Sequence, residues 1–275
     1  MKRVLCVQDM SCFGRCSLTV AMPVLSAMGI QACPLPTALL STHTGGLGTP
    51  VASEQTDFCM QALEHYKSLS LTFDGVYSGY LASGSQVKLV QECFAQNPDA
   101  LKVVDPVMGD NGKVYSNIPD THCQAMEQLC LEADVITPNV TESYILLGKE
   151  PVTTPMNSDA INEFLLSMRA KFKNAHLIVI TGVEHTSGKR GNACIWPNGE
   201  AQFLQYESVP QTYPGTGDIF TSILTGGLLR NGSAITSIRL ASKFISAAAR
   251  STIDTKGDPR FGVKFEPLLQ LLTPQ

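Results

Sequence analysis

The sequence lacks any hydrophobic run long enough to cross a membrane. Nowhere in its 275 residues do about 18 apolar residues follow one another, as a membrane-spanning helix requires. The first ten residues, MKRVLCVQDM, contain two basic residues and then a short apolar run, which is too short for the core of a signal peptide. The sequence therefore predicts no membrane-spanning helix and favours a cytoplasmic protein.

The sequence also lacks a basic run and a metal-binding cysteine spacing. Lys and Arg are scattered and the formal net charge is −4, so neither a nucleic acid nor a membrane surface is an expected partner. The nine cysteines form no pair of C-x-x-C units for a zinc site, although Cys12 and Cys16 are four apart and His122 precedes Cys123. We expect reduced, mostly buried thiols.

Hydrophobic residues are plentiful and follow a regular order. They make up 44% of the chain against 16% charged residues, which is enough to bury a sizeable core. Short β-rich runs alternate with amphipathic segments almost from end to end. The alternation predicts a single α/β domain over residues 1–275, with a mainly parallel sheet flanked by helices. The runs that predict buried strands are 3–7, 73–81, 101–108, 133–139 and 176–182.

Caps and turns delimit several other elements. In 158–173 apolar residues recur at helical spacing behind Ser158, which is a candidate N-cap. Asn231-Gly232 predicts the end of one helix, and Ser233 predicts the start of the next. The segment 192–209 predicts a hairpin that turns at Pro197-Asn198-Gly199 and adds antiparallel strands to the sheet.

Several predicted strands end in polar or small residues. In open α/β sheets the ligand site lies beyond the carboxyl ends of the strands, so these side chains would converge on one edge. Gly, Pro and Asn also terminate strands for purely structural reasons, but four such ends together favour a site. The four ends are Ser78-Gly79-Tyr80, Asp105-Pro106, Thr137-Pro138-Asn139 and Thr181-Gly182.

The stretch Gly215-Thr-Gly-Asp218 precedes an apolar run that is typical of a buried helix. Its glycines would let a ligand approach the backbone, and the first N–H groups of a helix have no internal partner. Such a helix start binds phosphate. Alone, Asp218 could be only a favourable first-turn carboxylate. The stretch is a poor match to a dinucleotide-binding motif, because the third glycine of that motif is missing. A conventional P-loop is also not present, because residues 182–190 have the wrong spacing for one.

Oxygen-bearing side chains follow two of the neighbouring strands. DPVMGDNGKVY (105–115) contains Asp105 and Asp110, and TPNVTE (137–142) adds Asn139 and Glu142. Carboxylates at this low density suit Mg²⁺, which keeps several of its waters. For Asp110, which lies in a Gly-Asp-Asn-Gly turn, a solvated surface loop is a strong alternative.

The segment 36–48, PTALLSTHTGGLG, reads as a flexible polar loop around His43. Such a loop either covers a pocket or joins two elements, and a lone histidine is more often structural. An anion site at a helix start, a carboxylate beside it and magnesium ligands nearby are the parts that phosphoryl transfer needs. Asp218 would then serve as general base for an attacking hydroxyl.

These residues resemble a known family. Gly215-Thr-Gly-Asp218 is similar to the signature of the ribokinase-like superfamily. Within it the vitamin B6 kinases share a set that this chain repeats in order over nearly its whole length. The set comprises Gln8 with Gly14, STHTG (41–45), SGYL (78–81), DPVMGD (105–110), TPN with Glu142, and GTGD (215–218).

The resemblance implies a ribokinase-like three-layer sandwich with a small antiparallel addition. It implies transfer of the ATP γ-phosphate to the 5′-hydroxyl of pyridoxal, pyridoxamine or pyridoxine, in the salvage of pyridoxal 5′-phosphate. Asp218 would be the base, and the amides of Gly215, Thr216 and Gly217 the anion hole. The family further implies Mg²⁺, a monovalent cation such as K⁺, and a homodimer.

The resemblance also implies two groups of binding residues. Asp105, Asp110 and Glu142 would act around the magnesium, and Tyr80 and Thr44 would contact the face and the polar edge of the vitamer ring. The implied nucleotide residues are Asp105, Asp110, Tyr115, Thr137, Asn139, Glu142, Thr181 and Gly182. The implied vitamer residues are Asp9, Met10, His43, Thr44 and Tyr80.

One position departs from the family, because Asp9 stands where many relatives have Ser. A carboxylate there would pair with a protonated ring nitrogen or with the amine of pyridoxamine. Two alternative functions stay open at this point. One is a hydroxymethylpyrimidine kinase of thiamine synthesis, which shares the GTGD site, although STHTG and SGYL favour B6. The other is a non-catalytic binder of a vitamer or nucleotide, which would have no chemical need for Asp218.

Overall fold

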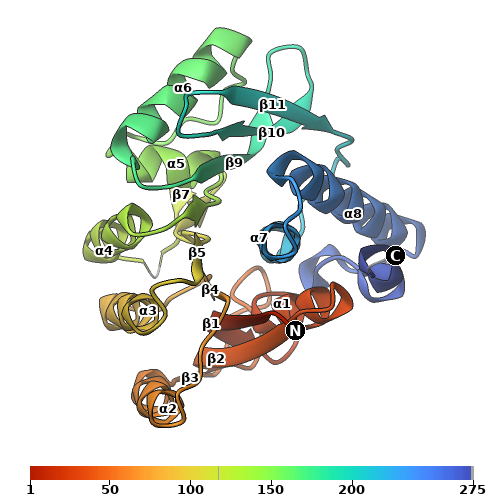
Figure 1. The fold of residues 1–275 in the computed structure, drawn as a ribbon. Helices are drawn as coiled ribbons and strands as arrows, with labels where there is room; N and C mark the ends of the chain where they lie inside the picture. Colours follow the sequence, from red (N-terminus) through yellow and green to blue (C-terminus); the bar gives the residue numbers. More distant parts are fainter. Residues whose placement is uncertain (117, 274–275) are drawn as a thin grey trace.

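The computed structural model describes residues 1–116 and 118–273, in which nine strands form one sheet (Figure 1). The strand order is β11-β10-β9-β8-β5-β4-β1-β2-β3. The six central strands are parallel, as the sequence predicts. Antiparallel strands extend both edges: the predicted hairpin forms one edge, and β3, which the sequence did not predict, forms the other. The strands are β1 (Arg3–Ser11), β2 (Gln31–Leu40), β3 (Ala52–Glu54), β4 (Gly75–Ser78), β5 (Leu101–Val104), β8 (Val135–Ile136), β9 (Leu177–Glu184), β10 (Arg190–Ile195) and β11 (Ala201–Tyr206), with a separate pair β6 (Gly109–Asp110) and β7 (Lys113–Val114).

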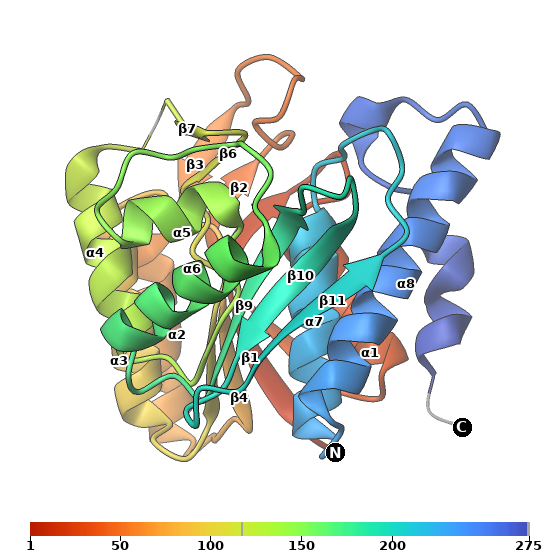
Figure 2. The ribbon, with the colours of Figure 1, turned by 90° about the horizontal axis from the view of Figure 1, so that it is seen from above.

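Helices cover both faces of the sheet and complete a three-layer sandwich (Figure 2). Within residues 1–116 and 118–273, no helix has the length and apolar character needed to cross a membrane. One face carries α2 (Thr56–Ser68), α3 (Gly84–Gln96), α4 (Asp120–Leu131), α5 (Val140–Leu146) and α6 (Ser158–Lys171). The other carries α1 (Leu18–Ala27), α7 (Thr216–Leu229), α8 (Ala234–Asp254) and the short helix η2 (Glu266–Leu272), which η1 (Pro259–Phe261) precedes.

The first strand shows why the predicted strands are continuously hydrophobic. Val4 and Cys6 belong to the hydrophobic cluster under α1, α7 and α8, whereas Leu5 and Val7 belong to the cluster under α2–α6. Successive strand residues point to opposite faces, and here both faces are covered. The run of residues 4–7 is therefore apolar at every position.

All five predicted strands are present, but three of them end earlier than expected. The runs 73–81, 101–108 and 133–139 form β4, β5 and β8, which are only two to four residues long. Pro106 and Pro138 have no N–H to donate to a neighbouring strand, so the ladder stops near them. The residues that follow each of these strands have no regular secondary structure.

The expectation of a loop over 36–48 is wrong for its first residues. Residues 36–40 belong to β2, which pairs in parallel with β1. Proline is rare inside sheets, but Pro34 and Pro36 lie in the part of β2 that β3 does not reach. Two residues apart, they direct their ring nitrogens to the same, unpaired side of the strand.

The other local predictions are confirmed with one correction. The hairpin pairs β10 with β11 in antiparallel register, and α7 and α8 are separated where Asn231-Gly232 and Ser233 predict. Helix α6 is capped by Asn157 rather than Ser158, because the side chain of Asn157 accepts the N–H of Ala160 at 2.8 Å. Ser158 is the first helical residue instead.

Candidate functional site

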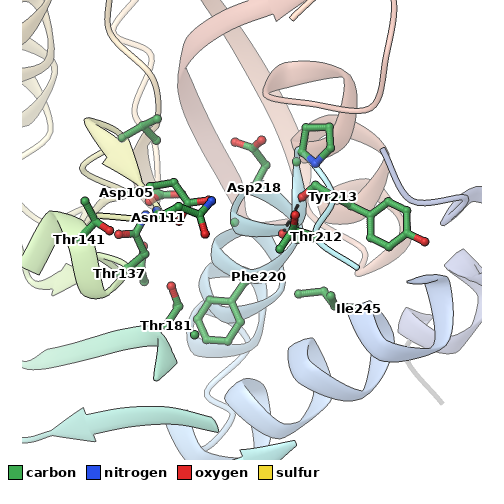
Figure 3. A pocket seen from close by; sticks show the side chains of 18 of the residues that line it. Asp105, Asn111, Thr137, Thr141, Thr181, Thr212, Tyr213, Asp218, Phe220 and Ile245 are labelled. Atoms are coloured by element: carbon green, nitrogen blue, oxygen red, sulfur yellow. Dashed lines mark hydrogen bonds between the residues drawn. The ribbon is translucent and has the colours of Figure 1, made fainter. Parts of the chain in front are cut away.

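The carboxyl ends of the parallel strands open into a cavity of about 690 Å³, as expected for an open α/β sheet. Figure 3 shows Asp218 at the start of α7, with Asp105, Thr137 and Thr181 on the side of the strand ends. The predicted site residues that line the cavity are Asp9, His43, Thr44, Tyr80, Asp105, Asp110, Tyr115, Thr137, Asn139, Glu142, Thr181, Gly182, Gly215, Thr216, Gly217 and Asp218.

Met10 is the predicted site residue that does not line this cavity. Its side chain packs against the hydrophobic cluster under α1, α7 and α8. Neighbouring residues of β1 point to opposite faces, so when Asp9 reaches the cavity, Met10 turns away from it. The structure therefore gives no support for a contact between Met10 and a ligand in this cavity.

The anion site predicted at Gly215 is built around the start of α7. Gly215 has φ 79°, and a Cβ atom there would stand 2.0 Å from the backbone oxygen of Arg15. A side chain would thus clash with the chain before α1 as well as strain the backbone. The first N–H groups of α7 face no earlier helical carbonyl, and they lie at the positive end of the helix dipole. This arrangement can receive a phosphate.

Asp218 lies in the first turn of α7 and is only 8% exposed. Its Oδ2 accepts the backbone N–H of Ser17 at 2.8 Å and the thiol of Cys16 at 3.4 Å. Burial raises the pKa of Asp218 to about 6, against the opposing effect of the Ser17 hydrogen bond. A carboxylate that gains a proton near neutral pH has the pKa expected of a general base.

Asp105 follows β5 and faces the second turn of α7. Its Oδ2 accepts the hydroxyl of Thr221 at 3.3 Å, and the hydroxyls of Thr221 and Thr137 lie 2.9 Å apart. Burial, followed by the negative charge of Asp218, raises the pKa of Asp105. Two buried carboxylates therefore share the cavity, and the charge of Asp218 disfavours ionisation of Asp105.

Glu142 and Asn139 form a capping box at the start of α5. The Glu142 carboxylate accepts backbone N–H groups of Met108 and Asn139 at 3.1 and 2.8 Å. The Asn139 amide donates to the oxygen of Gly109 at 2.8 Å. The box thus ties the start of α5 to the start of β6. Burial, followed by the charge of Asp105, raises the pKa of Glu142.

Asp110 and Tyr115 lie at the outer part of the cavity. Asp110 is exposed on the β6–β7 hairpin and accepts the N–H of Asn111 at 2.7 Å. Tyr115 is 41% exposed directly after β7. Among the described residues, no group of three or more His, Cys, Asp or Glu side chains is placed to hold a metal ion. The role of Asp105, Asp110 and Glu142 around a metal stays a prediction.

Gly182 is fixed by a residue that the sequence analysis did not name. The N–H of Gly182 donates to the Asn192 side-chain oxygen at 3.3 Å, and the Asn192 amide donates to the hydroxyl of Ser242 at 2.9 Å. Asn192 thereby joins β9, β10 and α8 at one side of the cavity. Its position in the predicted hairpin gave no sign of this role.

On the opposite side, Asp9 and His43 are both buried. The Ser11 hydroxyl donates to Asp9 at 2.9 Å, while burial raises the pKa of Asp9. His43 accepts the N–H of Gly45 at Nδ1, 3.0 Å away, so Nε2 donates to the oxygen of Arg260 at 2.7 Å. His43 therefore fixes the loop 41–45 against η1, and both ring nitrogens are used in doing so.

The sequence analysis also missed Cys16, Ser17 and Thr221, which all line the cavity. Thr221 was detectable, because it lies three residues after Asp218 and therefore on the same side of α7. Cys16 and Ser17 are some two hundred positions from Asp218, and nothing in the sequence connects them. Arg190 is the one Lys or Arg among the described lining residues, and it pairs with Glu184 at 3.2 Å.

The geometry brings together a carboxylate that can accept the proton of a hydroxyl and a site that can bind an anion. Asp218 can accept a proton beside the N–H groups at the start of the same helix. Arg190 is paired with Glu184, and the N–H groups at the start of α7 can stabilise negative charge in the cavity. Attack of an alcohol on a phosphate is the chemistry that this combination suits.

Comparisons with known proteins agree with this chemistry. The family model for phosphomethylpyrimidine kinase matches residues 22–260. A crystal structure from Bacteroides thetaiotaomicron, provisionally described as a phosphomethylpyrimidine kinase and containing pyridoxal, is 36% identical with a TM-score of 0.92. That match covers 98% of this chain and 95% of that chain.

Two further relatives are named as pyridoxal kinases. The crystal structure of pyridoxal kinase from Lactobacillus plantarum is 33% identical with a TM-score of 0.91, over 99% of this chain and 96% of that chain. Pyridoxal kinase PdxY of Leifsonia xyli subsp. xyli is 25% identical over 92% of this chain and 90% of its own length.

Proposed function

Because this chain belongs to the phosphomethylpyrimidine kinase family of ribokinase-like enzymes, we propose that it transfers the γ-phosphate of ATP to the 5′-hydroxyl of a vitamin B6 vitamer. The observation that carries the proposal is the placement of Asp218. A carboxyl with a pKa of about 6 stands in the first turn of a helix whose first N–H groups have no partner within the helix. A protein that only binds a vitamer would not need this group.

The chain's own residues account for the main requirements of the step. The hydroxyl oxygen attacks the γ-phosphorus, its proton passes to Asp218, and the bond to the departing ADP breaks. The start of α7, with Gly215, Thr216 and Gly217, stabilises the charge of the transferred group. Because Asp218 and this helix start are one rigid element, base and anion site keep a fixed separation.

The residues at the strand ends fit Mg²⁺ as the partner of ATP. Asp105 is a buried carboxylate beside a second carboxylate, and no unpaired Lys or Arg accompanies them among the described lining residues. Mg²⁺ binds proteins through one or two carboxylates and takes waters and phosphates as further ligands. Asp105 would hold it, and Asp110 and Glu142 would act through water. Bound there, it neutralises charge on the phosphates, and a monovalent cation such as K⁺ would assist.

Vitamin B6 is favoured over hydroxymethylpyrimidine by the relatives, since the Bacteroides structure contains pyridoxal and the Lactobacillus enzyme is a pyridoxal kinase. The name of the matching family model supports hydroxymethylpyrimidine as the second candidate. The deciding experiment compares kcat/KM for pyridoxal, pyridoxamine, pyridoxine and hydroxymethylpyrimidine, each with ATP. We expect the highest value for a B6 vitamer. A higher value for hydroxymethylpyrimidine would assign the chain to thiamine synthesis.

We also propose a cytoplasmic homodimer. The thiols of all nine cysteines are free, as is usual in a reducing compartment. Large hydrophobic side chains are exposed near the β3 edge, including Leu39 of β2, Val51 before β3 and Phe58 of α2. A second copy of the chain would cover them. Light scattering should give twice the chain mass for the wild type and a smaller mass for Val51→Lys; a monomeric wild type would contradict the proposal.

A further inference from the structure

The carboxylate of Asp218 is held on one side only. The Ser17 N–H at 2.8 Å and the Cys16 thiol at 3.4 Å both point to Oδ2. Within the described part of the chain, each hydrogen bond that reaches this carboxylate ends on Oδ2, and none ends on Oδ1. Both donors come from the two residues that precede α1, far from Asp218 in sequence.

The backbone of Ser17 is unusual in a way that serves this contact. Ser17 is buried, with 3% of its surface exposed. Its backbone angles are φ 54° and ψ −132°, a conformation that residues other than glycine rarely adopt. Such strain persists only where the surroundings enforce it, and it gathers at functional sites. Here α1 packs against α7, and the turn at Ser17 directs its N–H across to the first turn of α7.

The thiol of Cys16 stays protonated and can therefore donate a hydrogen bond. Burial raises its pKa far above the usual range, and the nearby charges of Asp218 and Asp9 raise it further. The groups that face Asp218 are otherwise acidic or neutral: Asp9 from β1, Asp105 after β5 and the buried Tyr77 of β4. The hydrogen bonds from the Ser17 N–H and the Cys16 thiol lower the pKa of Asp218, and so oppose the effect of burial.

We propose that Cys16 and the backbone of Ser17 are positioning groups for the base. They hold Oδ2, so Oδ1 is the oxygen that takes the proton of the substrate hydroxyl. The inference rests on the proposed kinase function. As the hydroxyl oxygen bonds to the γ-phosphorus, the bond from phosphorus to ADP breaks, and the proton on Oδ1 later leaves to water.

A purely structural explanation competes with this one. Ser17 is the N-cap residue of α1, so Asp218 could serve only to cap that helix. The two explanations differ in what the loss of the Cys16 thiol changes. A capping role affects stability, whereas a positioning role affects kcat while the KM of both substrates stays unchanged.

The test compares Cys16→Ala, Cys16→Ser and, as matched control, Cys12→Ala, because Cys12 is exposed and does not line the cavity. We expect Cys16→Ala to lower kcat roughly 3- to 10-fold, as the loss of one weak hydrogen bond would. The KM values for vitamer and ATP and the Tm should stay near those of the wild type. Cys16→Ser supplies a hydroxyl donor and should restore most of kcat, and Cys12→Ala should change nothing.

The variant Ser17→Gly tests the contribution of the Ser17 N–H. Glycine keeps the N–H that Asp218 accepts and adopts the observed φ without strain, but it removes the side-chain hydrogen bond of Ser17 to Asp9. The pH at which Asp218 titrates in the kcat profile should therefore stay near that of the wild type, because the donor to Oδ2 is kept. A large loss of kcat would show that the side chain of Ser17, rather than its N–H, matters.

Two results with the Cys16 variants would overturn the inference. An unchanged kcat in Cys16→Ala, or a lower Tm with unchanged kcat, would leave Asp218 as a cap for α1. Failure of Cys16→Ser to recover activity would exclude a donor at this position. These outcomes differ from failure of the proposed function, in which the wild type itself turns over no vitamer and the positioning role falls with the kinase.

Discussion

At the scale of single residues, burial of Asp218 links activity to stability. Its pKa is raised from 3.8 to about 6 in the folded protein. The folded state therefore binds this proton more tightly than the unfolded state. The resulting contribution to stability is complete below about pH 4 and is lost as the pH rises through about 6. Activity runs the other way, because a base must be ionised and kcat/KM should fall below about pH 6.

Asp218→Asn should therefore be more stable than the wild type at pH 8, while it loses activity. Asparagine keeps an oxygen for the Ser17 N–H but never ionises, which removes a cost of about 1–3 kcal/mol to the folded state. Urea unfolding at pH 8 and pH 4 measures the difference, and the gap should close at pH 4. A variant less stable than the wild type at pH 8 would contradict the assigned pKa.

Asp9 gives a prediction about vitamer choice. If its carboxylate pairs with the amine of the substrate, Asp9→Asn should raise the KM for pyridoxamine more than that for pyridoxine. The loss of one buried charge-assisted hydrogen bond corresponds to about tenfold or more. Steady-state kinetics with both vitamers decide the matter, and equal losses would remove the idea.

The same scale shows where sequence-based prediction succeeds and fails. The residues at strand ends and helix starts were found because secondary structure alone brings them to one edge. Met10, which the resemblance implies near the vitamer, does not line the cavity because it follows Asp9 in a strand and so faces the other way. Cys16 and Ser17 were missed because their contact with Asp218 depends on how α1 packs against α7. Tertiary packing of that kind leaves no trace in local sequence.

At the scale of elements, the start of α7 depends on the absence of a side chain at Gly215. In Gly215→Ala a Cβ would stand 2.0 Å from the Arg15 oxygen, so either α7 or the chain before α1 must move. We expect lower stability and, because the base and the anion site both belong to α7, a severe loss of kcat.

Gly188→Ala is the matched control for this change. Gly188 has the same φ of 79°, but a Cβ there would meet nothing within 4 Å. Both variants carry the backbone strain, and only Gly215→Ala carries the clash. Chemical denaturation should show Gly215→Ala to be less stable by about 1–3 kcal/mol more than the control. Equal losses would mean that the close approach to Arg15 is unimportant.

The elements themselves were largely predictable from pattern. The hydrophobic runs gave the central strands, and Pro197-Asn198-Gly199 gave the β10–β11 hairpin. Strand β2 has no such pattern: Pro34 and Pro36 are unfavourable in a strand, and the side of β2 that β3 leaves unpaired is what tolerates them. The pattern of a single segment does not reveal which strand lies at an edge.

At the scale of the whole molecule, we propose that residues 1–275 act as one domain. The C-terminal part closes onto the N-terminal part, since Arg15 pairs with Glu266 at 2.6 Å and His43 bonds to Arg260. Trp196 follows β10, which lies near the β11 edge of the sheet, far from the β3 edge in the strand order. Denaturation followed by fluorescence of this single tryptophan and by far-UV circular dichroism should give coincident transitions. Separate transitions would indicate independent units.

The central claim is that Asp218 takes the proton of a vitamer hydroxyl as the γ-phosphate arrives. Its most direct test is the rate of pyridoxal 5′-phosphate formation from pyridoxal and ATP by the wild type and by Asp218→Asn under saturating conditions. The account predicts a loss of roughly 10²–10⁴-fold in kcat with little change in either KM. Turnover by Asp218→Asn at the wild-type rate would contradict it.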